Sequence, residues 1–205
     1  MAATTKRKRL SAEARRVVIE EAASAVFARR GYAGASMDEI ARRSGVTVPV
    51  VYDHFPSKAA LYERLIDRHY AELRSVWFRH ADDGLPLGEW LAAAVDDWFA
   101  HVEAHPFAGR MLFHDTTGDP QLARMHKRIQ RRSRDALLPL VAEAGGIDGE
   151  VDVELAWETL RAVLQGLAVW WLDHPSVPRE RIVAATMGAV WLGLERVLEG
   201  ERWEA

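Results

Sequence analysis

The stretch from Ser36 to Tyr62, SMDEIARRSGVTVPVVYDHFPSKAALY, constrains the fold of this 205-residue chain more than any other. Ser36 followed three residues later by Glu39 is a capping box, which starts a helix. Gly45 permits a tight turn at the end of that helix, and Thr47 with Pro49 is typical of the start of a second helix. The spacing therefore predicts two short helices joined by a tight turn, the layout of a helix-turn-helix.

A helix-turn-helix places its second helix in the major groove of DNA, which is wide enough for one helix. The Tyr52 hydroxyl and the Lys58 ammonium are suited to phosphate contacts, and Arg42 and Arg43 either meet phosphates or form a solvated face. Helix starts also present free amides to phosphate. The residues expected to meet DNA are Ser36, Arg42, Arg43, Thr47, Val48, Pro49, Val50, Tyr52, His54 and Lys58.

Helical spacing of apolar residues continues on both sides of this motif, and no segment alternates as a strand does. Ser11 caps a first helix that ends near Gly31, and Ser57 caps a long helix running to about residue 80. His105-Pro106 breaks the amphipathic helix that begins at Leu87. We expect an all-α chain of about nine helices, the last two over about 151–173 and 179–199.

Composition limits the class of protein. Residues 1–60 carry a net charge of +5 and the remainder carries −8, which favours a polyanionic partner for the N-terminal part only. The basic arm Lys6 to Arg9 is either a solubilising tail or a contact to phosphate. The chain has no Cys, no apolar run of about 18 residues and no signal peptide, so we expect a soluble cytoplasmic protein without a membrane partner.

The last two helices favour a second copy of the chain as a partner. The segment 160–172 is apolar nearly all round, with only Arg161 and Gln165 polar, and such a helix must be covered on more than one side. Small residues recur at helical spacing in the final helix, where they let another helix approach. We expect a homodimer with an interface that includes Leu164, Leu167, Trp171, Ala185, Gly188, Ala189 and Leu192; the alternative is a monomer in which the long helix is central.

The stretch GYAGASMDEIARRSGVTVPVVYDHFPSKAALY resembles the DNA-binding domain of the TetR (tetracycline repressor) family of bacterial transcriptional regulators. The resemblance covers about residues 11–62, with many ordered positions at fixed spacing. Two positions depart from the usual pattern: Val48 replaces a polar residue, and Pro49 stands where Gly is more common. The side of the second helix that would face DNA therefore has few side chains able to hydrogen-bond to bases. Val48 or Val50 would recognise bases through contact with thymine methyl groups.

The resemblance implies a DNA-binding domain at residues 1–57 and a ligand-binding and dimerisation domain at 58–205. It also implies a repressor that leaves a palindromic DNA operator when a small hydrophobic or aromatic effector enters a cavity, with the long helix from Ser57 carrying the signal. Candidate cavity residues, each of which could equally be ordinary core, are Trp77, Trp98, Phe99, Met111, Phe113, His114, Met125, Ile129 and Trp157.

Other features suggest no enzyme, cofactor or metal. His101 and His105 have the spacing of a two-His metal pair, with His114 as a third ligand only if the fold brings it close, but capping of a helix end is the preferred interpretation. The basic run from Arg124 to Arg134 fits a solvated helix face better than a second nucleic-acid surface. The remaining alternative is a helical ligand carrier or an architectural DNA-binding protein without a specific operator.

Overall fold

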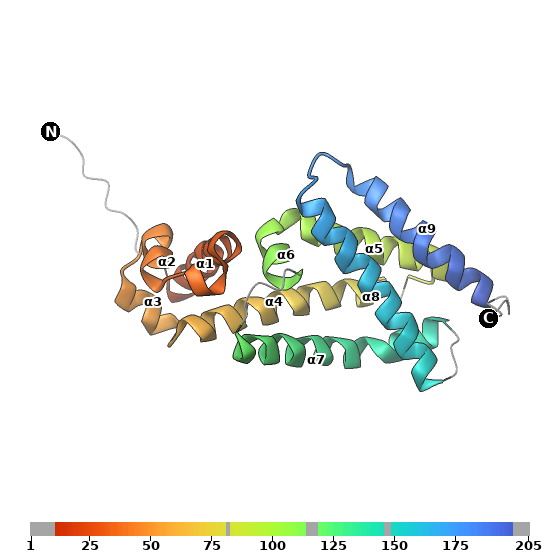
Figure 1. Ribbon diagram of the computed structural model, residues 1–205, viewed down its shortest axis with the longest axis horizontal. Helices are drawn as coiled ribbons and strands as arrows, with labels where there is room; N and C mark the ends of the chain where they lie inside the picture. Colours follow the sequence, from red (N-terminus) through yellow and green to blue (C-terminus); the bar gives the residue numbers. More distant parts are fainter. Residues whose placement is uncertain (1–10, 81–82, 114–118, 146–148, 199–205) are drawn as a thin grey trace. The chain divides into compact units, whose positions relative to one another are not determined.

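The computed structural model describes residues 11–80, 83–113, 119–145 and 149–198. Over those residues the chain forms nine helices and no strand (Figure 1), which confirms the all-α prediction. The basic arm at residues 6–9 lies outside the described residues. The helices are α1 (Ala12–Gly34), α2 (Met37–Ser44), α3 (Val48–His54), α4 (Lys58–Arg79), α5 (Leu87–Ala104), α6 (Pro106–Phe113), α7 (Pro120–Gly145), α8 (Glu150–Leu172) and α9 (Arg179–Leu198).

The contacts divide the chain into two compact units, Met1–Leu65 and Ile66–Ala205. The division falls inside α4, so the first part of this helix belongs to unit 1 and the rest to unit 2. The functional boundary expected after residue 57 stays a prediction, since the start of α4 packs with the helices before it.

Unit 1 is held together by apolar side chains at helical spacing. α1 packs against α2, and α2 against α3. Three aromatic rings join the end of α1 to the start of α4, because Tyr62 makes edge contacts with Phe27 and with Tyr32 at centroid distances of 4.9 and 5.2 Å. The side chains with no exposed surface are Ile19, Ala23, Val26, Ile40, Val51, Leu61 and Leu65.

The turn between α2 and α3 follows the sequence prediction. Gly45 has φ 68° and ψ 25°, the left-handed conformation that a side chain disfavours. The amide of Val46 donates to the carbonyl of Ala41 at 3.1 Å, which satisfies an orphan carbonyl at the end of α2. This closure sets the point at which α3 leaves α2.

Two capping predictions need correction. The Ser36 hydroxyl accepts from the amide of Glu39 at 3.2 Å, as expected, but the carboxylate of Glu39 does not complete a capping box. It binds Arg29 at 2.5 Å instead, because the end of α1 brings guanidinium groups within reach. Thr47 occupies the N-cap position of α3 with an extended backbone, yet its hydroxyl makes no capping hydrogen bond.

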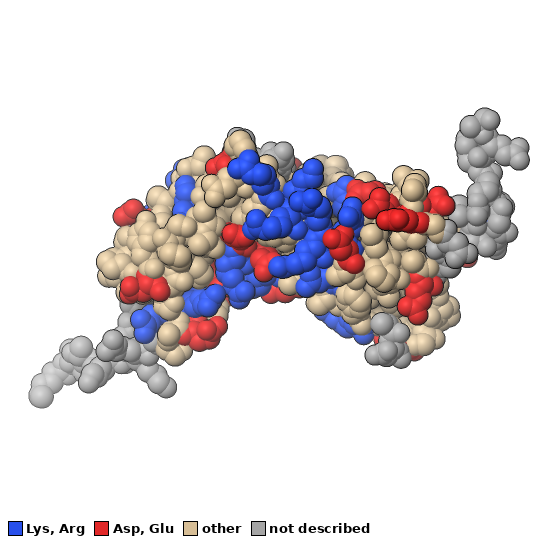
Figure 2. Space-filling model, turned by 90° about the horizontal axis from the view of Figure 1, so that it is seen from below, with Lys and Arg blue, Asp and Glu red and all other residues tan. Residues whose placement is uncertain are grey.

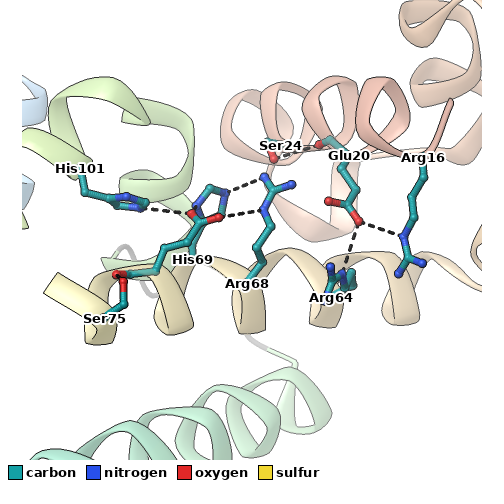
Figure 3. A network of polar contacts seen from close by, with 9 residues as sticks. Arg16, Glu20, Ser24, Arg64, Arg68, His69, Ser75 and His101 are labelled. Carbon is teal, nitrogen blue, oxygen red and sulfur yellow. Dashed lines mark hydrogen bonds and ion pairs between the residues drawn. The ribbon is translucent and has the colours of Figure 1, made fainter. Parts of the chain in front are cut away.

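A buried carboxylate fixes α1 against α4 within unit 1. Glu20 is 3% exposed, and its Oε1 lies 3.3 Å from Nε of Arg16 and 3.4 Å from Nε of Arg64 (Figure 3). A buried carboxylate is costly unless it is paired, so two guanidinium partners from different helices specify how these helices meet.

Lys58, the first residue of α4, anchors the start of that helix. Its Nζ donates to the carbonyls of Tyr32 and Ala35 at 2.8 and 2.9 Å, with the carbonyl of Ala33 at 3.5 Å. The same ammonium lies 4.5 Å from the centroid of the Tyr32 ring. The three donors of the ammonium therefore serve the segment that follows the kink at Gly31, where α1 has φ 67°.

Unit 2 is a helical body built around α5 and α8. α5 packs against α9, and α8 packs against α6, α7 and α9. Phe99 of α5 meets Trp171 of α8 edge-on at 5.9 Å, and Arg179 at the start of α9 binds Asp96 and Glu103 of α5 at 2.9 and 2.6 Å. Among the described residues, no helix is both long enough and apolar enough to span a membrane.

Lys58→Met should destabilise unit 1, because it leaves half-buried carbonyls without their charged donor. We expect a loss of about 2 kcal/mol of unfolding free energy, the usual range for a hydrogen bond to a charged group. Urea denaturation followed by circular dichroism measures this loss. Lys127→Met, an exposed substitution on α7, is the matched control; equal unfolding midpoints for the two variants would contradict the anchoring role.

Candidate functional site

The outward-facing side chains of α3 are mostly apolar or aromatic, with one exposed carboxylate, Asp53. Pro49, Tyr52 and Asp53 are exposed, while Val48, Val50 and His54 are half-buried. Val51 is fully buried, so it holds the helix to unit 1 while its neighbours face outward. Few of these outward-facing side chains carry hydrogen-bonding groups, and which of them meet DNA stays a prediction.

Polar groups suited to phosphate flank this surface. Tyr52 is 49% exposed, which leaves its phenol hydroxyl at the surface. Thr47 is exposed, and its hydroxyl makes no hydrogen bond within the described part of the chain. Arg42 and Arg43 are exposed in the last turn of α2. These four side chains remain free to meet an anionic backbone.

Two predicted phosphate contacts have other partners in the structure. The Lys58 ammonium donates to carbonyls at the end of α1, and the Ser36 hydroxyl accepts from the backbone of α2. A role for either side chain at DNA stays a prediction that requires these bonds to be shared. In the view of Figure 2, Lys and Arg side chains gather over the middle of one face, with Asp and Glu side chains among and beside them.

A cavity lies inside unit 2, with a volume of about 60 Å³. Most of its wall is apolar or aromatic, and the remainder is a small set of polar side chains from α4, α7 and α8. The lining residues are Tyr70, Leu73, Arg74, Trp77, Trp98, Phe113, Gln130, Ser133, Leu137, Trp157, Arg161, Leu164 and Gln165.

Four of the nine candidate cavity residues line this cavity: Trp77, Trp98, Phe113 and Trp157. Phe99, Met111, Met125 and Ile129 are buried but line neither this cavity nor the one beside it, so they belong to the core. His114 lies outside the described residues. The polar lining was missed, although Arg161 and Gln165 stand out as the two polar residues of an otherwise apolar stretch.

Several polar groups in the cavity wall lack partners. Ser133 Oγ and Trp157 Nε1 are buried without a hydrogen bond, and Arg74 has neither a hydrogen bond nor an ion pair among the described residues. Other polar groups are already engaged. Gln130 donates to the Tyr70 hydroxyl at 2.8 Å, and Arg161 donates to Gln165 at 2.7 Å. Burial raises the pKa of Tyr70 to about 12, so its hydroxyl stays protonated at neutral pH.

A second cavity of about 60 Å³ adjoins the first and is almost wholly apolar. The two cavities share three lining residues, Trp77, Leu137 and Trp157. The rest of the second cavity is lined by Leu87, Trp90, Leu91, Leu140, Val141, Ala156 and Leu194.

The predicted dimer residues fall into three groups by their exposure. Ala185, Gly188, Ala189 and Leu192 of α9 are exposed, and Leu192 is 57% exposed. Leu167 of α8 is half-buried. Leu164 and Trp171 are buried in the body itself, because Leu164 lines the cavity and Trp171 Nε1 donates to the carbonyl of Val177. These last two are corrected to core residues.

Histidines cluster where α4 meets α5 in unit 2. The His101 ring lies 5.6 Å from the His69 ring and 4.6 Å from the His105 ring, centroid to centroid. Burial lowers the pKa of His69 to about 3 and that of His101 to about 4, with further lowering from neighbouring positive charge. Both imidazoles are therefore neutral at neutral pH. The sequence pointed to His101 and His105 but missed His69.

The chain matches two family models. The model described as "Bacterial regulatory proteins, tetR family" matches residues 19–65, and that described as "Tetracyclin repressor-like, C-terminal domain" matches residues 86–190. The chain is 31% identical over 190 residues to the HTH-type transcriptional activator FasR of Mycolicibacterium smegmatis. The alignment covers 92% of this chain and 87% of that protein.

Solved structures share the fold over most of the chain. A TetR-like transcriptional regulator from Rhodococcus aligns with a TM-score of 0.76 at 24% identity, covering 91% of this chain and 99% of that one. The Bacillus subtilis regulator FadR, solved in complex with stearoyl-CoA, aligns with a TM-score of 0.68 at 19% identity, again covering 91% and 99%.

Substitutions on α3 should separate phosphate contact from base reading. Tyr52→Phe removes one exposed hydroxyl, so we expect about 5-fold weaker binding to every duplex tested, the equivalent of one hydrogen bond of about 1 kcal/mol. Val50→Ala should instead change the preference at particular base pairs. Fluorescence anisotropy on a panel of single-base-pair variants measures both; unchanged binding by both variants would show that α3 does not meet DNA.

Proposed function

Because the chain belongs to the TetR family of bacterial regulatory proteins, we propose that it is a homodimer that represses transcription from a palindromic operator and leaves it when an amphipathic ligand fills the cavity of unit 2. The chain is a helix-turn-helix transcriptional regulator. One relative is named as an activator and another as a repressor, so repression is the part of the proposal that a reporter assay in cells decides. The site of action is the cytoplasm, where a bacterial operator lies.

The unpartnered polar groups of the cavity carry the proposal for the ligand. Arg74 supplies a positive charge, and Ser133 Oγ and Trp157 Nε1 supply buried donors for which the described part of the chain offers no acceptor. A buried donor without a partner costs about 1–3 kcal/mol, so a ligand that accepts from these groups recovers that energy. An anionic or carbonyl-bearing head group meets both requirements.

The apolar wall indicates the other end of the ligand. Three side chains, Trp77, Leu137 and Trp157, line both cavities, and a shift of these side chains would join the cavities into one longer apolar space. A long alkyl tail fits such a space better than a compact aromatic ligand. The B. subtilis regulator of the same fold is a precedent, since it was solved with stearoyl-CoA.

The cavity is too small for a ligand as it stands, so ligand binding must change the shape of the body and can thereby affect DNA binding. A cavity of about 60 Å³ holds only a few water molecules, whereas ligand sites typically measure about 300–1,000 Å³. The ligand therefore binds a widened state of the body and shifts the population toward it. α4 lines the cavity through Leu73, Arg74 and Trp77, and its first turns belong to the DNA-binding unit. Widening moves this helix and changes the separation of the two recognition helices, which must match about one DNA turn of ~34 Å.

The exposed faces of α8 and α9 support the dimer. α9 presents a row of small residues, Ala185, Gly188 and Ala189, next to the exposed Leu192. α8 presents Leu155 and Trp170, which are 60% and 46% exposed. Exposure of large apolar side chains to water costs free energy, and the small residues beside them let a second copy of the chain pack closely.

Arg74→Ala should weaken the binding of an anionic ligand with little effect on a neutral one. We expect about 10-fold weaker binding of stearoyl-CoA and decanoate, the cost of one hydrogen bond to a charged group, and a smaller change for 1-decanol. Three of the chain's eight Trp residues, Trp77, Trp98 and Trp157, line the cavity, so quenching of intrinsic fluorescence reports binding.

Arg124→Ala, which removes a positive charge from an exposed position on α7, is the matched control. It should bind all three ligands as the unaltered protein does. The ligand should also release bound DNA from the unaltered protein at the concentration that quenches fluorescence. Binding that quenches fluorescence yet leaves DNA affinity unchanged would contradict the coupling, and equal losses in the two arginine variants would contradict the cavity site.

Gly188→Leu should disrupt the dimer while leaving the fold of each chain intact. A Cβ at this position meets no atom within 4 Å in the described part of the chain, so a single chain tolerates it. At a close helix–helix contact the same side chain forces the copies apart. Sedimentation velocity should show a shift from dimer to monomer, with Ala123→Leu on α7 unchanged. A Gly188→Leu protein that stays dimeric would place the interface elsewhere.

A further inference from the structure

Three potential metal ligands lie together at the contact between α4 and α5. His69 and Glu72 are three residues apart on α4, which places them on one face of that helix. His101 approaches His69 from α5 (Figure 3). His69 Nδ1 lies 3.2 Å from Glu72 Oε2, and His101 Nε2 lies 3.8 Å from the same oxygen. One ligand atom from each of the three residues lies within 4.8 Å of the other two.

The two imidazoles aim unsatisfied nitrogens at this point. His69 is 2% exposed, and within the described segments neither its Nδ1 nor the Nε2 of His101 makes a hydrogen bond. Burial of polar nitrogens without partners costs free energy, and an apolar side chain at position 69 would avoid that cost. Two such nitrogens converging on one carboxylate oxygen are the arrangement that a metal ion satisfies.

We propose that His69, Glu72 and His101 bind one divalent transition-metal ion of the zinc class. Two imidazole nitrogens with one carboxylate oxygen form a donor set that suits Zn²⁺ and its neighbours, rather than Mg²⁺ or Ca²⁺, which prefer oxygen alone. Three protein ligands leave a fourth position open. The proposal is independent of the cavity ligand, because none of the three residues lines either cavity.

The spacing needs little adjustment to hold an ion. Metal–ligand bonds of about 2.0–2.2 Å in a tetrahedron place neighbouring ligand atoms roughly 3.4 Å apart. The contact from His69 Nδ1 to Glu72 Oε2, at 3.2 Å, already matches this spacing, and the contact from His101 Nε2, at 3.8 Å, is slightly long. A small rotation of the His101 side chain closes the remaining distance.

Arg68 is the group that competes with the ion. Its Nε lies 3.7 Å from Glu72 Oε1, and one terminal nitrogen lies 3.3 Å from His69 Nε2. Metal at His69 Nδ1 requires the proton on Nε2, which would then face the guanidinium as a second donor. The Arg68 side chain is 26% exposed and long, so it swings outward when the ion binds. Removal of this charge should therefore tighten metal binding.

The site differs from the pair that the sequence suggested. His105 follows the end of α5 and is exposed, and its ring stands beside the other two without joining the group of three. Glu72 and His69 come from α4, which is a distant segment of the sequence. An ion bound here links α4 to α5 within unit 2, on a set of α4 residues separate from those that line the cavity.

The test is a titration of the full chain, without a polyhistidine tag, with Co²⁺ and with Zn²⁺. We expect one ion per chain, visible d–d absorption bands for Co²⁺, and displacement of Co²⁺ by Zn²⁺. Glu72→Gln and His101→Gln should each weaken binding by at least about 100-fold, since second-shell changes alone typically cost 10–100-fold. Glu72 has a 43% exposed side chain, so Glu72→Gln tests the site without disturbing the core.

His80→Gln is the matched control, because His80 is also paired with carboxylates but has Asp83 and Asp97 on opposite ring nitrogens. It should keep full affinity, and Arg68→Met should bind Co²⁺ about 10-fold more tightly as a charged competitor is removed. The proposal is overturned if the unaltered chain binds no ion. It is equally overturned if Glu72→Gln and His101→Gln leave affinity unchanged, or if His80→Gln loses as much as they do.

Discussion

The bonds from the Lys58 ammonium to the carbonyls at the end of α1 are the constraint on which the DNA-binding unit depends. They join the start of α4 to the segment that leads into α2, and the aromatic contacts of Tyr62 repeat the connection one turn later. The paired carboxylate of Glu20 fixes the same helices at Arg64. The start of α4 is therefore fixed to α1, which packs against α2, and α2 in turn packs against α3. The charged groups that fix it lie in half-buried surroundings, where such bonds are strongest.

α4 continues from that anchored start into unit 2, where its side chains serve two further groups of residues. One set lines the cavity, and another, His69 and Glu72, meets His101 of α5. Signals at either group act on a helix whose first turns are fixed to the DNA-binding unit. In this account a single helix connects the binding of DNA, effector and metal ion. The free energy that shifts this helix is the difference in a ligand's affinity for two arrangements of the body.

Local rules predicted much of this structure from the sequence. Capping residues and helical spacing predicted the nine helices found in the described residues, and Gly45 predicted the turn, because these depend on neighbours within a few residues. Side chains whose partners lie far along the chain were not predictable in this way. Lys58 bonds to carbonyls 23 to 26 residues away, Arg74 faces a cavity built from α7 and α8, and His69 meets a ligand partner on another helix. The burial of Leu164 and Trp171 depends on the same long-range packing.

Selection of bound duplexes from a random DNA pool tests the central claim most directly. The account predicts recovery of a palindrome with two half-sites about one DNA turn apart, and loss of the bound duplexes when stearoyl-CoA is added. Binding should also weaken steeply with salt, because phosphate contacts release counterions. Recovery of unrelated sequences with equal affinity would contradict the account and would identify an architectural DNA-binding protein instead.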